Sequence, residues 1–84
     1  MPELTEKISG LVETVVRPLI EFEDDFEISA YEESGNTIVV ELRVNEADAG
    51  KVIGRQGRII KAVRTVARAA ASQENAHVEV ELID

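Results

Sequence analysis

The chain has 84 residues and a mass of 9.2 kDa, which suffices for one compact domain and leaves no room for a separate cofactor domain. With 44% hydrophobic and 31% charged residues, it is too apolar for a disordered tail and too charged for a membrane span, and its lack of cysteine excludes disulfides and thiolate metal sites. The net charge of −8 argues on average against a polyanionic partner, and the acidic N-terminus is unlike a secretory signal, so we expect a cytoplasmic protein.

The first predicted element is an amphipathic helix over residues 3–20. Apolar residues recur there at spacings of three and four, from Leu4 to Leu19, which places them on one helix face. Pro18 is expected to kink or close the last turn because it has no N–H group. The acidic run from Glu21 to Asp25 has no periodicity and is expected to form a solvated connector.

Two strands are predicted next, over residues 26–33 and 37–44. Apolar and polar residues alternate in both, as they do in half-buried strands. The sequence Ser34-Gly35-Asn36 between them is typical of a turn, so we expect an antiparallel hairpin. The outward face of this hairpin is mostly glutamate.

Two helices and a last strand complete the chain. The helix over 46–53 is expected to begin after Asn45 as its cap, the helix over 58–73 carries one apolar face, and the strand over 77–83 alternates again. The order α-β-β-α-α-β indicates an α+β fold, with helices packed on one face of a three-stranded mixed sheet.

The charge is distributed unevenly along the chain. Residues 1–48 contain thirteen acidic residues and three lysines or arginines, and residues 74–84 contain four acidic residues and no lysine or arginine. Residues 49–73 contain six basic residues and no acid. One local surface can therefore attract an anion while the rest of the molecule repels it.

The basic segment contains the sequence Val52-Ile53-Gly54-Arg55-Gln56-Gly57-Arg58-Ile59-Ile60-Lys61. Two glycines three positions apart join two helices and permit a sharp turn with close backbone approach to a ligand. The first N–H groups of the second helix are expected to be unpaired at its positive end, where a phosphate is stabilised. Arg55 and Arg58 add charge at this point, and the strip is extended by Lys51, Lys61, Arg64 and Arg68.

Two readings of this segment remain open on spacing alone. Two such glycines also occur in ordinary tight turns beside a solvated basic helix face. The phosphate motifs of nucleotide hydrolases and dinucleotide-binding proteins are absent, because Gly50, Gly54 and Gly57 have the wrong gaps. The lone His77 has no second metal ligand spaced with it, and no nucleophile has an adjacent base. We therefore expect no catalytic residue, no metal, no cofactor and no enzyme activity.

The segment resembles the central signature of the KH domain, a nucleic-acid-binding module whose GxxG loop holds about four nucleotides. The element order matches the bacterial type II arrangement, and nearly the whole chain, as one domain over 1–84, is similar to free-standing KH proteins of the KhpA type. This resemblance implies an RNA-binding protein and RNA chaperone without a membrane partner. It implies pairing with a second copy or with a larger KH partner of the KhpB (Jag, EloR) type, and a role in cell elongation and envelope homeostasis.

The resemblance also assigns roles to individual residues. Gly54 and Gly57 give the close backbone approach, and Arg55 and Gln56 face the phosphates of single-stranded RNA. Electrostatic attraction is expected from Lys51, Arg55, Arg58, Lys61 and Arg64, and an apolar floor for bases from Val52, Ile53 and Ile60. Core packing is expected to be the main role of Ile53 and Ile60. The alternative from another class is a dimerising protein-interaction adaptor whose basic strip binds an acidic protein.

Overall fold

The computed structural model describes residues 1–83, so the last residue of the domain predicted over 1–84 lies outside the described residues. The main elements are α1 (Pro2–Val16), β1 (Glu27–Glu33), β2 (Thr37–Arg43), α2 (Glu46–Ile53), α3 (Arg58–Ser72) and β3 (His77–Ile83). Short 3-10 turns are present at η1 (Arg17–Leu19), η2 (Glu23–Asp25) and η3 (Arg55–Gly57). The predicted order of helices and strands and the α+β class are confirmed.

The three strands form one mixed sheet in the order β1-β2-β3. β1 and β2 pair antiparallel, with Glu27 opposite Arg43, which confirms the predicted hairpin. β2 and β3 pair parallel, with Thr37 opposite His77. Because parallel neighbours need a crossover connection, α2 and α3 together carry the chain from the end of β2 back to the start of β3.

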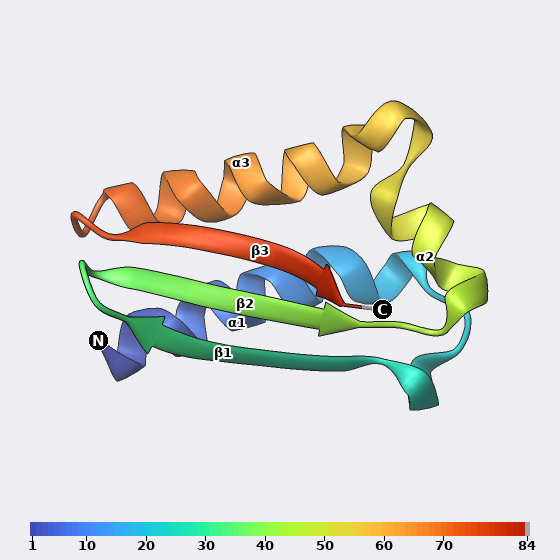
Figure 1. Cartoon of the computed structure of the whole chain (residues 1–84), viewed down its shortest axis with the longest axis horizontal. Coiled ribbons are helices and arrows are strands. Elements are labelled where there is room, and N and C mark those ends of the chain that lie inside the picture. The colour runs from blue at the N-terminus through green and yellow to red at the C-terminus, as the bar shows by residue number, and fades with distance from the viewer. Residues whose placement is uncertain (84) are drawn as a thin grey trace.

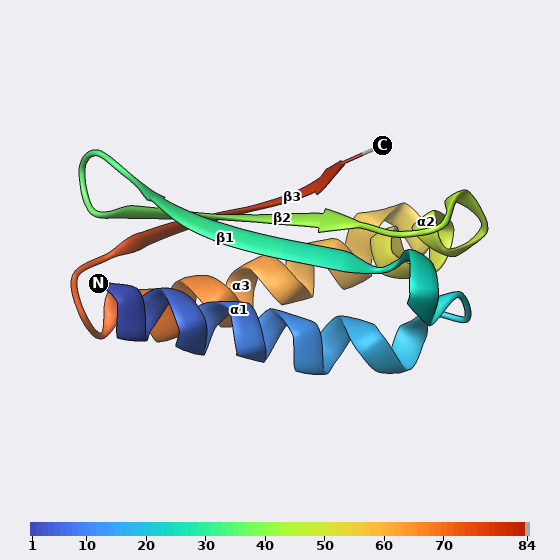
Figure 2. The same ribbon diagram turned by 90° about the horizontal axis from the view of Figure 1, so that it is seen from below.

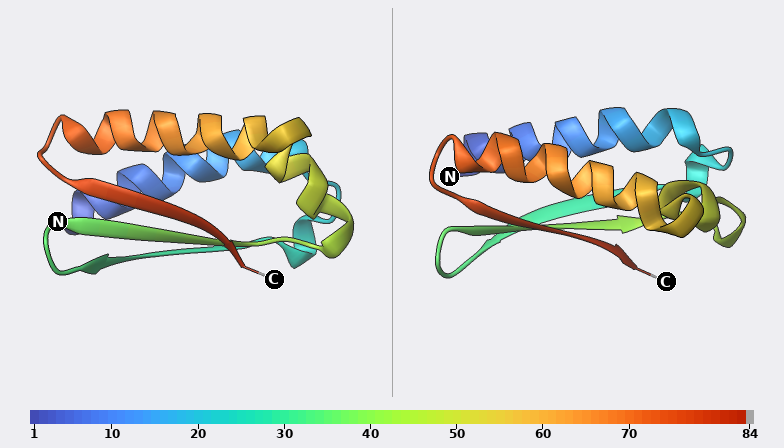
Figure 3. Two further views of the ribbon diagram at one scale, coloured as in Figure 1. Left: turned by 45° about the horizontal axis from the view of Figure 1, so that its top comes forward. Right: turned by 90° about the horizontal axis from the view of Figure 1, so that it is seen from above.

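The helices α1 and α3 lie side by side on one face of the sheet, and no element of residues 1–83 covers the other face (Figures 1 and 2). α3 runs along β3, which is an edge strand, and α2 lies at the end of the sheet where β2 finishes (Figure 3). The core between the layers is aliphatic; its largest fully buried apolar side chains are Ile8, Ile38, Leu42, Val12, Val16, Val40 and Val52. No helix within residues 1–83 has both the length and the apolar character needed to cross a membrane.

The first helix ends earlier than the predicted span of 3–20. Its α-helical part stops at Val16, and Arg17–Leu19 continue as a 3-10 turn that contains Pro18. Proline cannot donate to the carbonyl four residues earlier, so the α-helical hydrogen-bond ladder is interrupted there. The cap predicted for α2 is present, since the Asn45 side chain accepts a hydrogen bond of 2.8 Å from the Ala47 N–H.

Candidate nucleic-acid interface

The two glycines of the basic segment form a tight connection between α2 and α3 (Figure 1). Gly54 follows α2 at φ 79° and ψ 171°, and Gly57 precedes α3 in the left-handed region at φ 74°. A side chain at Gly54 would overlap Ile59, whose backbone nitrogen lies 2.8 Å from the Cβ position. At Gly57 the nearest atom to such a Cβ would be Lys61 Cε at 3.9 Å, so only its backbone angle favours glycine.

The expectation that α3 begins with bare N–H groups is wrong in part. The Gly57 N–H donates to the Gly54 carbonyl at 3.1 Å, and the Arg58 N–H donates to the Arg55 carbonyl, because η3 inserts a 3-10 turn before the helix. No side chain of the described residues caps α3. Among residues 1–83, the N–H groups of Arg55 and Gln56 have no intramolecular hydrogen bond. The free amides therefore lie on the loop itself, at Arg55 and Gln56, and not at the start of α3, which begins at Arg58.

Three predicted bases near this loop are exposed: Arg55, Arg58 and Lys61. Within the described part of the chain none of them forms an ion pair; the Arg58 guanidinium donates one hydrogen bond of 3.2 Å to the Gln56 side-chain oxygen. Their charges are thus not neutralised by neighbouring carboxylates. The loop presents two free amides and three unpaired cations to solvent, an arrangement that suits a phosphate chain.

Two other predicted bases are engaged by the protein. The Lys51 ammonium lies 3.4 Å from the Asp48 carboxylate and 3.7 Å from that of Glu21. The half-buried Arg64 donates from Nε to the Val80 carbonyl of β3 at 3.1 Å. Lys51 is therefore partly neutralised, and Arg64 joins α3 to the edge strand while its remaining N–H groups stay available.

The predicted apolar floor is divided between the core and the surface. Val52 is fully buried and Ile60 is 7% exposed, so both side chains belong to the core, as expected for Ile60. Core packing as the main role of Ile53 is wrong: its side chain is 41% exposed at the last position of α2. Ile53 is thus the one of the three apolar side chains that a ligand at the loop can contact.

Asp48 is a residue with a structural role that the sequence analysis missed. Its fully buried carboxylate accepts hydrogen bonds from the N–H groups of Glu21, at 3.0 Å, and Phe22, at 2.9 Å. Burial alone would raise the pKa of Asp48, but these two bonds and the Lys51 ammonium outweigh burial and lower it. Asp48 thereby fastens the connector after α1 to α2, the helix that leads into the loop.

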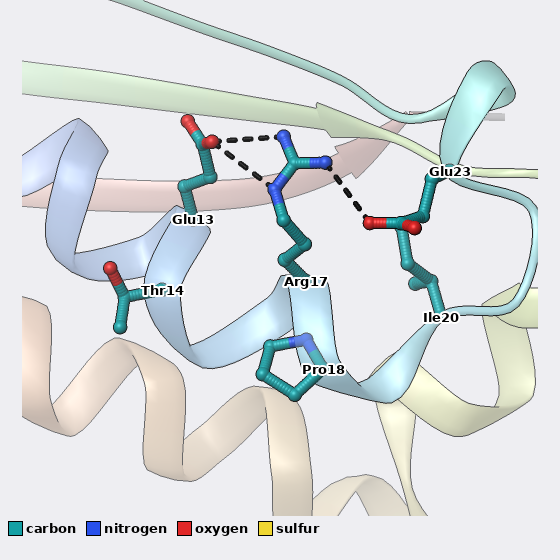
Figure 4. Close-up of a pocket in the computed structure, with 6 residues that line it drawn as sticks. All are labelled: Glu13, Thr14, Arg17, Pro18, Ile20 and Glu23. Carbon is teal, nitrogen blue, oxygen red and sulfur yellow. Dashed lines mark hydrogen bonds and ion pairs between the residues drawn. The ribbon is translucent and has the colours of Figure 1, made fainter.

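A surface hollow of about 540 Å³ lies at the end of α1, and none of its lining residues belongs to the loop (Figure 4). Arg17 spans it, pairing with Glu13 at 2.9 Å and Glu23 at 3.5 Å and lying 5.0 Å from the centre of the Phe26 ring. The hydrogen bond to Glu13 is the main cause that raises the pKa of Arg17. Arg17 thereby joins α1 to the connector, and the lining of the hollow, with two carboxylates and one guanidinium, offers no unpaired cation to a phosphate. In residues 1–83 no three potential metal ligands cluster together.

Comparison with known proteins gives consistent matches over most of the chain. The family model described as KhpA/KhpB, KH domain, matches residues 9–82. The "RNA-binding protein KhpA" of Clostridium acetobutylicum is 49% identical over 74 residues, which cover 87% of this chain and 96% of that protein. The protein of the same name from Borreliella burgdorferi is 42% identical, over 88% of this chain and 89% of its own length. That of Bacillus subtilis is 38% identical, over 94% and 96%.

One solved structure shows the same fold in a larger protein. Era from Aquifex aeolicus matches with a TM-score of 0.61 and 18% sequence identity. The match covers 95% of this chain and 32% of the Era chain, so this chain spans about a third of that protein's length. At this identity the likeness concerns the fold alone.

Proposed function

Because the chain belongs to the KhpA/KhpB KH-domain family, a non-enzymatic family, we propose that it binds single-stranded RNA through the loop from Gly54 to Gly57. The observation that carries the proposal is the coincidence, at one loop, of free amides and unpaired cations. The Arg55 and Gln56 N–H groups are unbonded, and Arg55, Arg58 and Lys61 are exposed without an acidic partner within residues 1–83.

The proposed roles of the loop residues follow from this geometry. Gly54 and Gly57 let the backbone turn, Arg55 and Gln56 offer amides to a phosphate oxygen, and Arg58 and Lys61 attract the chain. Arg64 contributes from the α3 side, and Lys51 contributes less because two carboxylates hold it. The exposed Ile53 supplies apolar contact to a base, while the buried Val52 and Ile60 support the loop from beneath.

Reversal of the loop's charge tests the RNA site. We expect the double variant Arg55→Asp with Gln56→Asp to abolish RNA binding, because acidic side chains repel phosphate, while circular dichroism shows an unchanged fold. The matched control is Ser34→Asp with Arg43→Asp, which changes the net charge equally at exposed hairpin positions. RNA affinity retained by the folded loop variant in fluorescence anisotropy would contradict the site.

The salt dependence of binding tests whether phosphates are the target. Two to four phosphate contacts predict a slope of roughly −1.4 to −2.8 in a plot of log affinity against log salt concentration, since each contact to a single strand contributes about −0.7. The measurement is titration of an oligouridylate at several salt concentrations. A slope near zero would mean that the loop binds something other than the sugar-phosphate chain.

We further propose that the protein acts as a cytoplasmic RNA chaperone in cell elongation and envelope homeostasis, with the whole chain as one KH domain. In this proposal it pairs with a second copy or with a KhpB-type partner. The family model's name joins KhpA with KhpB, and Val15 on α1 and Val66 on α3 are 38% and 44% exposed on the helical layer. Sedimentation of the chain alone and with such a partner tests the pairing, which the substitution Val66→Glu is expected to weaken.

The alternative of a protein-interaction adaptor has the same scaffold and a different ligand. An electrophoretic shift assay with cellular RNA, run with and without the partner, separates the two. An adaptor requires no shift in either lane and a complex between the two proteins alone.

A further inference from the structure

The free side of β1 is the second edge of the sheet. β1 pairs only with β2 and lies at the margin of the sheet opposite β3 (Figure 1). An edge strand directs the N–H and C=O groups of alternate residues away from its one partner. Within residues 1–83, the backbone of residues 27–33 takes part in no hydrogen bond other than those to β2. The outward groups of β1 are therefore available to a further strand.

The β1 edge lacks most of the features that protect an edge strand. Residues 27–33 contain no lysine, proline or glycine. All seven pair with consecutive residues of β2, so no bulge twists this edge away from an incoming chain. The β3 edge differs, since the Arg64 guanidinium occupies the Val80 carbonyl there. A strand can therefore add to β1 more readily than to β3.

A surface groove lies beside this edge, between β1 and α1. It has a volume of about 280 Å³ and is lined by Thr5, Glu6, Ser9, Gly10 and Glu13 of α1 and by Ala30 of β1. Figure 2, which looks onto this side of the molecule, shows α1 running along β1. Ser9, Gly10 and Ala30 are small residues, and a Cβ at Gly10 would meet no atom within 4 Å. The groove therefore has room for the side chains that an added strand would turn toward α1.

The charge around the edge selects the kind of strand. β1 carries three glutamates, and the groove is lined by two more and by no lysine or arginine of residues 1–83. Neither Glu27 nor Glu33 forms an ion pair in this part of the chain. Antiparallel pairing of two copies centred on Ala30 would place Glu27 opposite Glu33, and like charges directly opposite each other destabilise a sheet. A basic strand would instead be attracted at both positions.

We infer that the β1 edge is a docking site for an extended, lysine- or arginine-rich segment of another protein, which adds to the sheet as a fourth strand. Backbone hydrogen bonds to β1 hold the segment. Its side chains alternate between the two faces, so that basic ones meet Glu27 and Glu33 on the open face and small apolar ones enter the groove beside Ala30. No residue of this site belongs to the Gly54–Gly57 loop, so the inference goes beyond the proposed function.

The probe is a peptide of alternating lysine and valine with the seven-residue length of β1, titrated without RNA and followed by NMR. On binding, we expect alternate backbone amides of β1 to become protected from hydrogen exchange, because an added strand bonds only the groups that face it. The same peptide with every backbone nitrogen methylated has no donors for β1, and it is expected not to bind. Equal binding of the two peptides, or binding without protection in β1, would overturn the inference.

Charge reversal at both ends of β1 tests the choice of partner. Glu27→Lys with Glu33→Lys is expected to weaken binding of the lysine-valine peptide about tenfold, because two attractive pairs become repulsive. Glu79→Lys with Glu81→Lys is the matched control, since it changes the net charge equally at exposed positions of β3. No loss at β1, or an equal loss in the control, would overturn the inference. Protection of β1 that rises with protein concentration without peptide would assign the edge to a second copy and likewise overturn it.

Discussion

The two faces of this small molecule differ in sign and in the way their charges are held. The surface that runs from the loop along α3 carries Arg55, Arg58, Lys61 and Arg68 without a carboxylate partner in residues 1–83. The open sheet face is mostly acidic; its exposed or half-buried carboxylates are Glu27, Glu33, Glu41, Glu79 and Glu81. A chain with a net charge of −8 can thus present a polyanion with a cationic surface, because the signs are sorted by face.

The acidic face is closely packed at its centre. Val39 on the middle strand is only 3% exposed although no helix of residues 1–83 covers it, and Tyr31 lies opposite it on β1. The Tyr31 hydroxyl donates to the Glu41 carboxylate at 3.3 Å. Partial burial, followed by the charge of Glu41, raises the pKa of Tyr31. The two faces therefore differ in how their polar groups are used. On the sheet face the Tyr31 hydroxyl is bonded to Glu41, whereas the amides of Arg55 and Gln56 and the cations of the loop remain available to a ligand.

The largest expected effect comes from a single methyl group at the loop. Gly54→Ala is expected to lower the free energy of unfolding by roughly 1 to 3 kcal/mol and to abolish RNA binding, because the new Cβ overlaps Ile59 and the backbone angles are those of glycine. Gly10→Ala is the matched control in α1, where a Cβ meets no atom within 4 Å. It is expected to stabilise the protein by about 0.5 to 1 kcal/mol. Chemical denaturation measures both, and equal effects would contradict the steric role of Gly54.

A smaller effect is expected where the connector is fastened to α2. Asp48→Asn is expected to lower the thermal midpoint at pH 7, because a neutral amide replaces the charged acceptor of two N–H groups. Since the folded-state pKa of Asp48 lies below its ordinary value of 3.8, its stabilising contribution is complete above that pH. The contribution is lost as the pH falls through the lower folded-state pKa.

Thermal melts from pH 7 down to pH 2 check this assignment. The difference in thermal midpoint between the original protein and the Asp48→Asn variant is expected to decrease below pH 3.8. Glu46→Gln is the control, as an exposed acid in the same helix turn. A difference in thermal midpoint that does not depend on pH would show that the packing of the Asp48 side chain, and not its charge, stabilises the fold.

The smallest expected effect concerns the acidic face itself. Replacing Glu41, Glu79 and Glu81 with glutamine is expected to raise RNA affinity less than twofold at 0.15 M salt, where the Debye length is about 8 Å, and more at low salt. The measurement is RNA titration at two ionic strengths. An increase in RNA affinity that persists at high salt would mean that RNA contacts the sheet face. It would contradict the assignment of RNA binding to the cationic face alone.

The sequence was sufficient to predict the features that depend on local pattern. Periodicity predicted the helices and strands, and the spacing of Gly54 and Gly57 identified the loop. Asn45, a residue type common at helix starts, was correctly predicted to cap α2. The error over the free amides was also local, since a 3-10 turn of three residues moved them from the start of α3 to Arg55 and Gln56.

The features that the sequence did not predict depend on tertiary packing. Asp48 resembled a surface acid at a helix start, and only the folding of the connector across α2 buries it. Ile53 resembled a core residue, yet it is exposed because α2 ends there and the chain turns away. The contact of Arg64 with β3 could not be foreseen without knowing which strand lies at the edge of the sheet.

That contact has a consequence for how the protein avoids aggregation. A strand with an unpaired side is a template onto which another polypeptide can add, and evolution commonly protects such sides with positively charged residues. By occupying the Val80 carbonyl, the Arg64 guanidinium removes one acceptor that an incoming strand would need. The Arg64 side chain, which lies beside the proposed RNA site, thereby also disfavours the addition of another chain to the edge of the sheet.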